Sequence, residues 1–173
     1  LRIRLTTARA RRPAAQGYKM RDEEDEYDDD GNIISDPDHD GGIRTAARVW
    51  FADPAAAKAR YGPIASWDVS EVTDLSELFE FQANFNEDLS RWDVSNVVYM
   101  YCLFNGATSY NGDLSSWNVS NVVHMGGMFY GATSFDRQLG GAWATSTADK
   151  TFMFRNSPGT IAGKTKDANG TIA

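Results

Sequence analysis

Apolar residues recur at fixed offsets from four regularly spaced tryptophans in the central and C-terminal parts of the chain. The spacings are 25, 25 and 26 residues, and the segments that follow the tryptophans are near-copies. In the three full copies, apolar residues fill offsets +2, +5, +8, +11, +12, +18 and +22. Such a period is typical of repeat proteins, in which each repeat buries its apolar side against its neighbours. The tryptophans are Trp67, Trp92, Trp117 and Trp143.

The apolar spacing is not the alternation of an ordinary β-sheet, and it suits a short extended piece, a turn and about one helical turn in each repeat. We therefore expect an α/β repeat protein, a short solenoid of about three full coils and a degenerate fourth. The Ala-rich segment Thr45–Tyr61 predicts an N-terminal capping helix that ends at Gly62-Pro63. The expected organisation is a basic extended arm (1–21), an acidic linker (22–42), a helical cap (43–63), the repeats (64–156) and an extended C-terminal tail (157–173).

Short polar side chains follow each tryptophan at fixed positions. Asp, Asn and Ser side chains accept backbone N–H bonds at turns and helix starts, which gives these positions a structural role. The repeat itself explains the acids, so a catalytic carboxylate pair is disfavoured. The residues are Asp68, Asp93 and Asn118, then Ser70, Ser95 and Ser120, and at a second corner Asn86, Asn111, Asp88 and Asp113.

The repeat reads W-D-V-S-x-V-T-x-L/M-x-x-L/M-F, followed by F-N-x-D-L-S-x-W, over about residues 43–156. This pattern resembles the BspA-type leucine-rich repeats of bacterial surface proteins and mycoplasma lipoproteins. The resemblance implies a leucine-rich-repeat-like solenoid that is used for contacts, and it supplies no common active site. The fourth copy keeps Trp143 and the pair Met153-Phe154 but lacks the valines, as expected of a terminal repeat.

The net charge of −7 conceals two opposite poles at the start of the chain. Residues 1–21 carry seven Lys or Arg and no acid, and residues 22–40 carry eleven Asp or Glu and no Lys or Arg. We expect the basic arm to extend away from the repeats and to contact an acidic surface of another protein. RNA and anionic lipid are the alternatives, and the adjacent acids disfavour nucleic acid. The arm residues chosen as partner contacts are Arg2, Arg4, Arg9, Arg11 and Arg12.

No run of the sequence approaches the 18 or more apolar residues that a membrane span requires. Peripheral membrane association stays open. The Arg-rich start is compatible with the remains of an organelle transit peptide and equally with a basic arm on an otherwise acidic protein. The compartment stays open, with an algal organelle, the chloroplast, favoured over the cell surface.

The acidic stretch contains two segments that read acid-x-D-x-D-G-x-I, as at the start of a calcium-binding loop. The glutamate expected at the twelfth place is missing from both, where Pro37 and Ala47 stand instead. A solvated acidic linker is therefore favoured over calcium binding, and no other cofactor is expected. The tentative calcium ligands are Glu26, Asp28, Asp30, Asp36, Asp38 and Asp40.

Aromatic residues gather at the offsets between the apolar columns. Tyr99, Tyr101, His124 and Tyr130 predict a contact patch on the second and third repeats. The single cysteine, Cys102, is interpreted as incidental, and nothing indicates nucleophilic or metal catalysis.

These observations favour a non-enzymatic interaction or structural module, an accessory subunit docked in a larger protein assembly through its repeats and tails. The alternative is an extracellular cell-surface adhesion or recognition fragment, for which calcium binding stays open. The sequons at Asn118 and Asn169 are compatible with that alternative, although Asn118 belongs to a turn position.

Overall fold

The computed structural model describes residues 4–6 and 42–172, and all structural statements below concern those residues. Regular secondary structure is sparse: three α-helices, one 3₁₀ helix and four short strands. The strands form two separate two-stranded parallel sheets, β1–β2 and β3–β4. The elements are β1 (Arg4–Thr6), α1 (Ile43–Ala52), α2 (Pro54–Tyr61), the 3₁₀ helix η1 (Ile64–Ser66), β2 (Asp68–Glu71), β3 (Gln138–Leu139), α3 (Ala142–Thr145) and β4 (Thr160–Ile161).

The N-terminal cap is a pair of helices, so the predicted single helix over Thr45–Tyr61 is wrong. The break falls at Asp53 because Pro54 lacks an N–H group and disfavours helical backbone at the residue before it. Asp53 instead caps α2, since its Oδ1 accepts the N–H groups of Ala55 and Ala56 at 2.9 and 3.0 Å. Gly62, with φ of 79°, ends α2.

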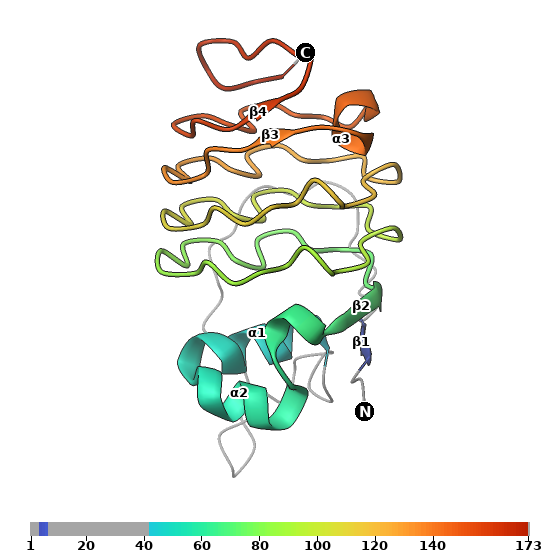
Figure 1. Cartoon of the computed structure of the whole chain (residues 1–173), viewed down its shortest axis with the longest axis vertical. Coiled ribbons are helices and arrows are strands. Elements are labelled where there is room, and N and C mark those ends of the chain that lie inside the picture. The colour runs from blue at the N-terminus through green and yellow to red at the C-terminus, as the bar shows by residue number, and fades with distance from the viewer. Residues whose placement is uncertain (1–3, 7–41, 173) are drawn as a thin grey trace, which may run out of the picture.

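Each repeat forms one layer, and the layers lie above one another beyond the two helices (Figure 1). In the stretch from Leu75 to Phe81 and its copies, N–H groups of one layer donate to carbonyl oxygens of the next layer. Other bonds between layers run the opposite way, such as Val98 N to Thr73 O (2.8 Å) and Ser109 N to Ala83 O (3.0 Å). Isolated parallel bridges mark the same contact at Asp74, Tyr99, His124 and Asp149. The repeating bonds include Leu75 N to Tyr99 O (2.9 Å), Met100 N to His124 O (2.9 Å) and Met125 N to Asp149 O (2.8 Å).

The predicted leucine-rich-repeat-like α/β solenoid is wrong. No helix recurs from repeat to repeat, and strand pairing between the full repeats is reduced to isolated bridges. The expected helical turn is replaced by successive turns, such as Leu78 N to Leu75 O and Gln82 N to Phe79 O. Glu77 and Phe81 have positive φ of 62° and 57°, which ends any helix before it can propagate.

The predicted apolar columns are confirmed as the core, since every residue at those offsets in the three full repeats is buried. Like side chains stack on like between layers. The tryptophans also bond to the previous layer, where the indole N–H groups of Trp92, Trp117 and Trp143 donate to backbone carbonyls at 2.9 to 3.0 Å. The rings of Phe79, Phe104, Phe129 and Phe154 follow one another at centroid distances of 5.3, 5.5 and 5.4 Å.

The predicted turn role is confirmed for five of the short polar side chains. It is wrong for Asn86 and Asn111, whose Oδ1 atoms accept N–H groups of the next layer, from Asn111 at 2.8 Å and from Asp136 at 3.2 Å. Asp68, Asp93 and Asn118 each accept the N–H of the serine two residues later, at 3.1 to 3.2 Å. Asp88 and Asp113 do the same at 2.9 Å. Their geometry is therefore fixed by the backbone turns.

The segment after the fourth repeat closes the stack, so the prediction of an extended C-terminal tail is wrong. β4 pairs with β3, and Ile161 and Ile172 are buried in the core. This segment also forms hydrogen bonds with the edge of the last layer. Phe154 N donates to Gly170 O at 2.9 Å, and Phe152 N donates to the Thr171 hydroxyl at 2.9 Å. Buried apolar side chains and the unpaired edge both favour this closure.

The expectation that the basic arm extends away from the repeats is wrong for residues 4–6. These residues form β1, which pairs in parallel with β2 in the register Arg4 to Asp68 and Thr6 to Glu71. Within the part of the chain that the structure describes, every helix is too short or too polar to cross a membrane.

Candidate functional site

Two columns of left-handed backbone shape one side of the stack. At offset +10 the residues are Glu77, Cys102 and Gly127, with Phe152 in the fourth repeat, and all have φ between 51° and 63°. Four residues later the column is Phe81, Gly106, Gly131 and Asn156, again with positive φ. Only glycine and asparagine adopt this conformation readily, so Phe81 and Phe152 hold strained backbone. Both side chains are nevertheless exposed, at 70% and 41%.

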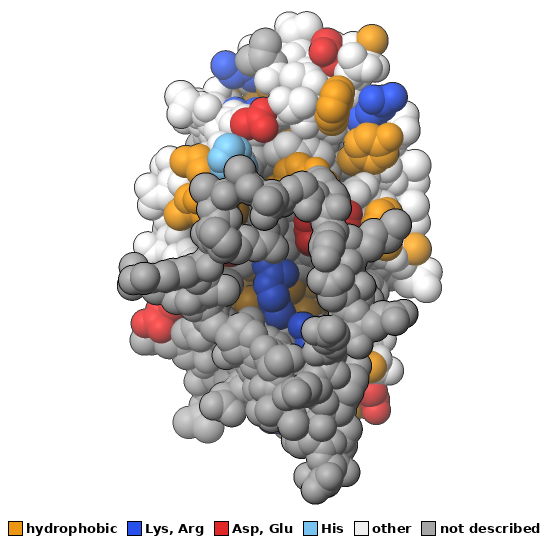
Figure 2. Space-filling view, turned by 180° about the vertical axis from the view of Figure 1, so that it is seen from behind, with side chains coloured by type: hydrophobic (Ala, Val, Ile, Leu, Met, Phe, Trp, Pro, Cys, Tyr) orange, Lys and Arg blue, Asp and Glu red, His pale blue; other side chains and the backbone are white. Residues whose placement is uncertain are grey.

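Aromatic side chains form an exposed surface that we call the aromatic face: Tyr99, Tyr101, His124, Tyr130 and Phe152. Tyr99 is 45% exposed and Tyr101 39% exposed, and the rings of Tyr99 and His124 are stacked at 5.7 Å. Figure 2 shows hydrophobic side chains gathered near a histidine on the side of the molecule opposite to the view of Figure 1. Exposed apolar side chains grouped in this way are typical of contact surfaces.

A shallow pocket of about 470 Å³ lies within the aromatic face. Its floor contains Gly126 and Gly127, which hold it open. A Cβ at Gly126 would stand 3.5 Å from the Tyr101 ring and 3.4 Å from the Asp149 carboxylate, and one at Gly127 would stand 2.9 Å from the Cys102 sulfur. The lining residues are Tyr101, Cys102, Asn105, Gly126, Gly127, Tyr130, Asp149, Thr151 and Phe152.

Asp149 is the one ionisable carboxylate in the pocket lining. Its Oδ1 accepts the Thr151 N–H at 3.0 Å and the Thr151 hydroxyl at 2.6 Å. The hydroxyl bond lowers the pKa of the Asp149 carboxyl, so the group is ionised at neutral pH. Oδ2 has no hydrogen-bond partner among the described residues and borders the space above Gly126.

Arg155 lies beside the pocket rather than in its lining. Its guanidinium carbon is 5.8 Å from the Tyr130 ring centroid and 5.6 Å from that of Phe152, within cation–π range of both. Arg155 therefore lies against two of the pocket's rings, at one end of the lining.

The Cys102 thiol sits in the pocket as a buried, protonated group. Burial raises its pKa to about 11, and the charges of Glu80 and Glu77 contribute to the rise. A thiol with this pKa is not a nucleophile at neutral pH. The described residues also contain no group of three or more His, Cys, Asp or Glu side chains arranged to hold a metal ion.

The structure brings Tyr99, Tyr101, His124 and Tyr130 together on one side of the stack, and Tyr101 and Tyr130 line the same pocket. Arg4 lies in β1, with its backbone paired to Asp68. Arg2, Arg9, Arg11 and Arg12 lie outside the described residues. The tentative calcium ligands Glu26, Asp28, Asp30, Asp36, Asp38 and Asp40 also lie outside them.

Sequence reasoning missed Asp149, Phe152, Arg155 and the glycine floor. A signal was present in the repeat alignment, because shifting the fourth repeat by one residue places Thr151 in the column of Tyr101 and Gly126. The same shift places Phe152 in the column of Cys102 and Gly127. The prediction of a degenerate terminal repeat placed no contact residue on the fourth repeat.

A family model described as "Mycoplasma protein of unknown function, DUF285" matches residues 49–163. The chain belongs to this family. The suggested membership of the BspA-type leucine-rich repeats is therefore corrected, since no leucine-rich-repeat family matches. No curated protein and no solved structure matches the chain. The family description names no activity, so the function has to be argued from the site.

Proposed function

We propose that this protein is a non-enzymatic protein-binding module, an accessory subunit that docks in a larger assembly through its aromatic face. The observation that supports this proposal best is the pocket itself. Tyr101, Tyr130 and Phe152 surround an opening whose floor is kept clear by Gly126 and Gly127. Tyrosine and other aromatic side chains are enriched at protein interfaces, where they contribute most of the binding energy from small, well-packed pockets.

The strained backbone at Phe152 supports the same proposal. Glycine occupies the equivalent place in the third repeat, where it satisfies the left-handed conformation without cost. A phenylalanine there costs about 1–2 kcal/mol of backbone strain, and its ring is 41% exposed. Local backbone geometry disfavours phenylalanine here, as it does at Phe81, but of these two rings that of Phe152 lines the pocket, which favours a role in binding.

The chemistry of the pocket favours binding over catalysis. Its thiol is protonated at neutral pH, and its carboxylate is held by Thr151 and has no second acid or base within the lining. Acid–base catalysis requires paired groups with pKa values adjusted toward the working pH. The lining offers contact surface and one fixed negative charge.

Site-specific photo-crosslinking in the organism of origin tests this proposal. A benzophenone amino acid in place of Tyr101 in the full chain should crosslink to one defined protein. The same probe in place of Asp136, which is exposed and outside the pocket, should not. Adding Phe152→Gly should remove the crosslink, and adding Phe81→Gly should leave it.

Phe152 and Phe81 form a matched pair, because both are exposed phenylalanines at positive φ and glycine suits the backbone of each. Equal crosslinking from positions 101 and 136, or a crosslink that survives Phe152→Gly, would contradict the proposal. The alternative of a calcium-binding adhesion fragment stays a prediction, because its proposed ligands lie outside the described residues.

A further inference from the structure

If the aromatic face is the binding surface proposed above, the residues that line its pocket determine which kind of side chain the pocket binds. Three aromatic rings, from Tyr101, Tyr130 and Phe152, share the lining with the carboxylate of Asp149. Aromatic faces carry negative electrostatic potential and attract cations, and an adjacent carboxylate adds full charge complementarity. Cysteine, asparagine and threonine complete the lining without adding a positive charge.

The free oxygen of Asp149 gives the pocket a directed acceptor. Oδ1 is held by two bonds from Thr151, which fixes the orientation of the carboxylate. Oδ2 and the Tyr101 ring both stand within 3.5 Å of the point that a Cβ at Gly126 would occupy. The Tyr101 ring and the Asp149 carboxylate therefore lie on either side of Gly126 in the lining, within reach of one cation in the pocket.

Charges around the pocket reinforce this preference on one side. Glu77 and Glu80 lie close enough to raise the pKa of the Cys102 thiol, which shows that negative potential reaches the pocket floor. Positive charge acts in the opposite direction: Arg155 packs on Tyr130 and Phe152 outside the lining, and the charges of His124 and Lys150 help to lower the pKa of the Asp149 carboxyl.

We propose that the pocket binds a lysine or arginine side chain of a partner protein, with the cation held between the Tyr101 ring and Asp149 and flanked by Phe152 and Tyr130. This inference rests on the proposed function and specifies the partner's chemistry. Affinity for one such side chain is weak, since an exposed cation–π contact strengthens binding only about two- to fivefold. The remaining affinity has to come from the surrounding aromatic face.

NMR titration of the ¹⁵N-labelled full chain tests the inference at single-residue resolution. The probe is the peptide acetyl-(Gly-Lys)₃-amide, compared with acetyl-(Gly-Glu)₃-amide and acetyl-(Gly-Leu)₃-amide. The lysine peptide should shift the amide signals of Gly126, Gly127 and Thr151, and the other two should leave them unchanged. Reading these signals separates the pocket from the acidic stretch 22–40, which attracts any cationic peptide.

Three variants identify the groups responsible. Asp149→Asn should weaken binding of the lysine peptide at the pocket about threefold to fivefold, as expected for loss of an exposed ion pair. Phe152→Gly should weaken it about two- to fivefold through loss of one ring. Phe81→Gly and Asp136→Asn are the matched controls and should not change it.

Arg155→Gln distinguishes a cationic occupant from an acidic one. If the occupant is a lysine or arginine, removing the neighbouring positive charge should strengthen binding about twofold. Weaker binding by Arg155→Gln, pocket shifts with the glutamate or leucine peptide, or an unchanged affinity in Asp149→Asn would each overturn the inference. A crosslink from position 101 together with any of these results would leave the proposed function standing and remove only the assigned charge.

Discussion

The two ends of the repeat stack are closed by different means. At the N-terminal end, side chains of α1 cover the first layer: Trp50 meets Trp67 edge-on at 6.0 Å, and Phe51 meets Phe79 at 5.9 Å. At the C-terminal end, the backbone of residues 157–172 takes the place of a further repeat, with Gly170 O accepting the Phe154 N–H. A helix covers one end. An irregular segment covers the other end and accepts the hydrogen bonds that a further repeat would accept.

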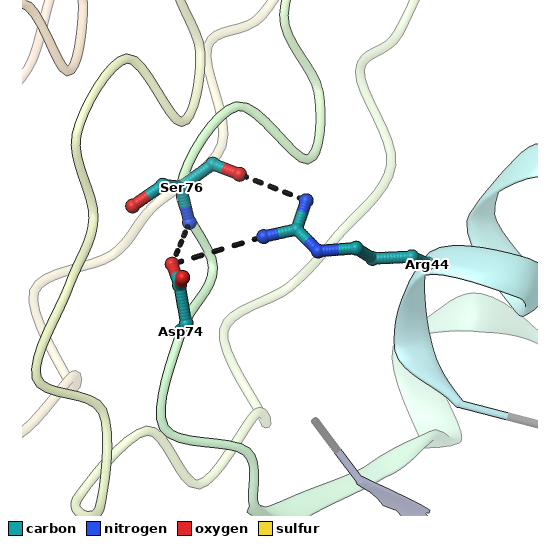
Figure 3. Close-up of polar contacts among 3 residues, drawn as sticks. All are labelled: Arg44, Asp74 and Ser76. Carbon is teal, nitrogen blue, oxygen red and sulfur yellow. Dashed lines mark hydrogen bonds and ion pairs between the residues drawn. The ribbon is translucent and has the colours of Figure 1, made fainter. Parts of the chain in front are cut away.

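The direction of the hydrogen bonds in one stretch of each layer accounts for part of this difference. From Leu75 to Phe81 and in the copies of this stretch, each layer donates its N–H groups forward, so this part of the first layer presents carbonyl oxygens and that of the last layer presents N–H groups. Figure 3 shows a side chain that supplies a donor to the carbonyl oxygens of the first layer. The Arg44 guanidinium donates to Ser76 O at 3.0 Å and pairs with the Asp74 carboxylate at 3.7 Å. The N–H groups of the last layer need hydrogen-bond acceptors. The side of a helix offers no free backbone carbonyls, because those carbonyls already accept hydrogen bonds within the helix. Carbonyl and hydroxyl oxygens of residues 170–171 supply them.

The largest effect is expected at the N-terminal end from Trp50→Ala. Trp50 is 9% exposed and packs on Trp67, so its truncation should lower the free energy of unfolding by about 3–4 kcal/mol. Urea denaturation of the full chain measures the change. Val123→Ala, at a side chain that is 46% exposed, should change stability by less than about 0.5 kcal/mol. Similar small losses from both variants would mean that the helical cap does not stabilise the stack.

At the C-terminal end, Gly170→Ala should have the next largest effect. Gly170 has φ of 77°, and a Cβ there would collide with the backbone of Phe154 and Arg155. We expect a loss of about 2–3 kcal/mol, combining strain with displacement of the closing segment. The matched variant is Gly163→Ala, where φ is 71° but nothing lies within 4 Å of the added Cβ. It should cost only about 1 kcal/mol, and equal losses in thermal unfolding would show that the close backbone approach is unimportant.

Thr171→Val tests whether the last layer requires an acceptor. The substitution keeps the shape of the side chain but removes the oxygen that accepts the Phe152 N–H at 2.9 Å. A loss of about 1 kcal/mol is expected, together with faster hydrogen exchange of the Phe152 amide. Thr160→Val, in β4, removes a hydroxyl without a hydrogen bond in the described structure and should leave that amide unaffected. Unchanged exchange in Thr171→Val would refute the assigned role.

The smallest effect is expected from Arg44→Met, which removes the bond to Ser76 and the ion pair with Asp74 at the first layer. Both side chains are about one-third exposed, so the expected loss is about 0.5–1 kcal/mol. Part of it should disappear at 1 M NaCl, because the ion pair is screened while the hydrogen bond is not. Lys58→Met, on the exposed side of α2, is the control. A loss that is independent of salt would assign the whole effect to the hydrogen bond.

The amino-acid sequence by itself determined the layers and the core. Identical side chains at a 25-residue period, such as Phe79, Phe104 and Phe129, have their lowest energy when each is buried against its copy, and that requirement fixes which residues meet. The turn positions of Asp68 and Asp93 were equally predictable, because their hydrogen bonds are local.

Only the tertiary structure decided what the backbone does between those positions. Glu77, Cys102 and Phe152 adopt positive φ against their intrinsic preference, because the packed columns and the bonds between layers over-determine the turns. The same long-range bonds excluded the expected helix and placed residues 157–172 on the last layer. They also brought Asp149 of the fourth repeat beside Tyr101 of the second, across a one-residue shift in the period. Local propensity carries no information on such contacts, because their energy depends on layers that are far apart in the chain.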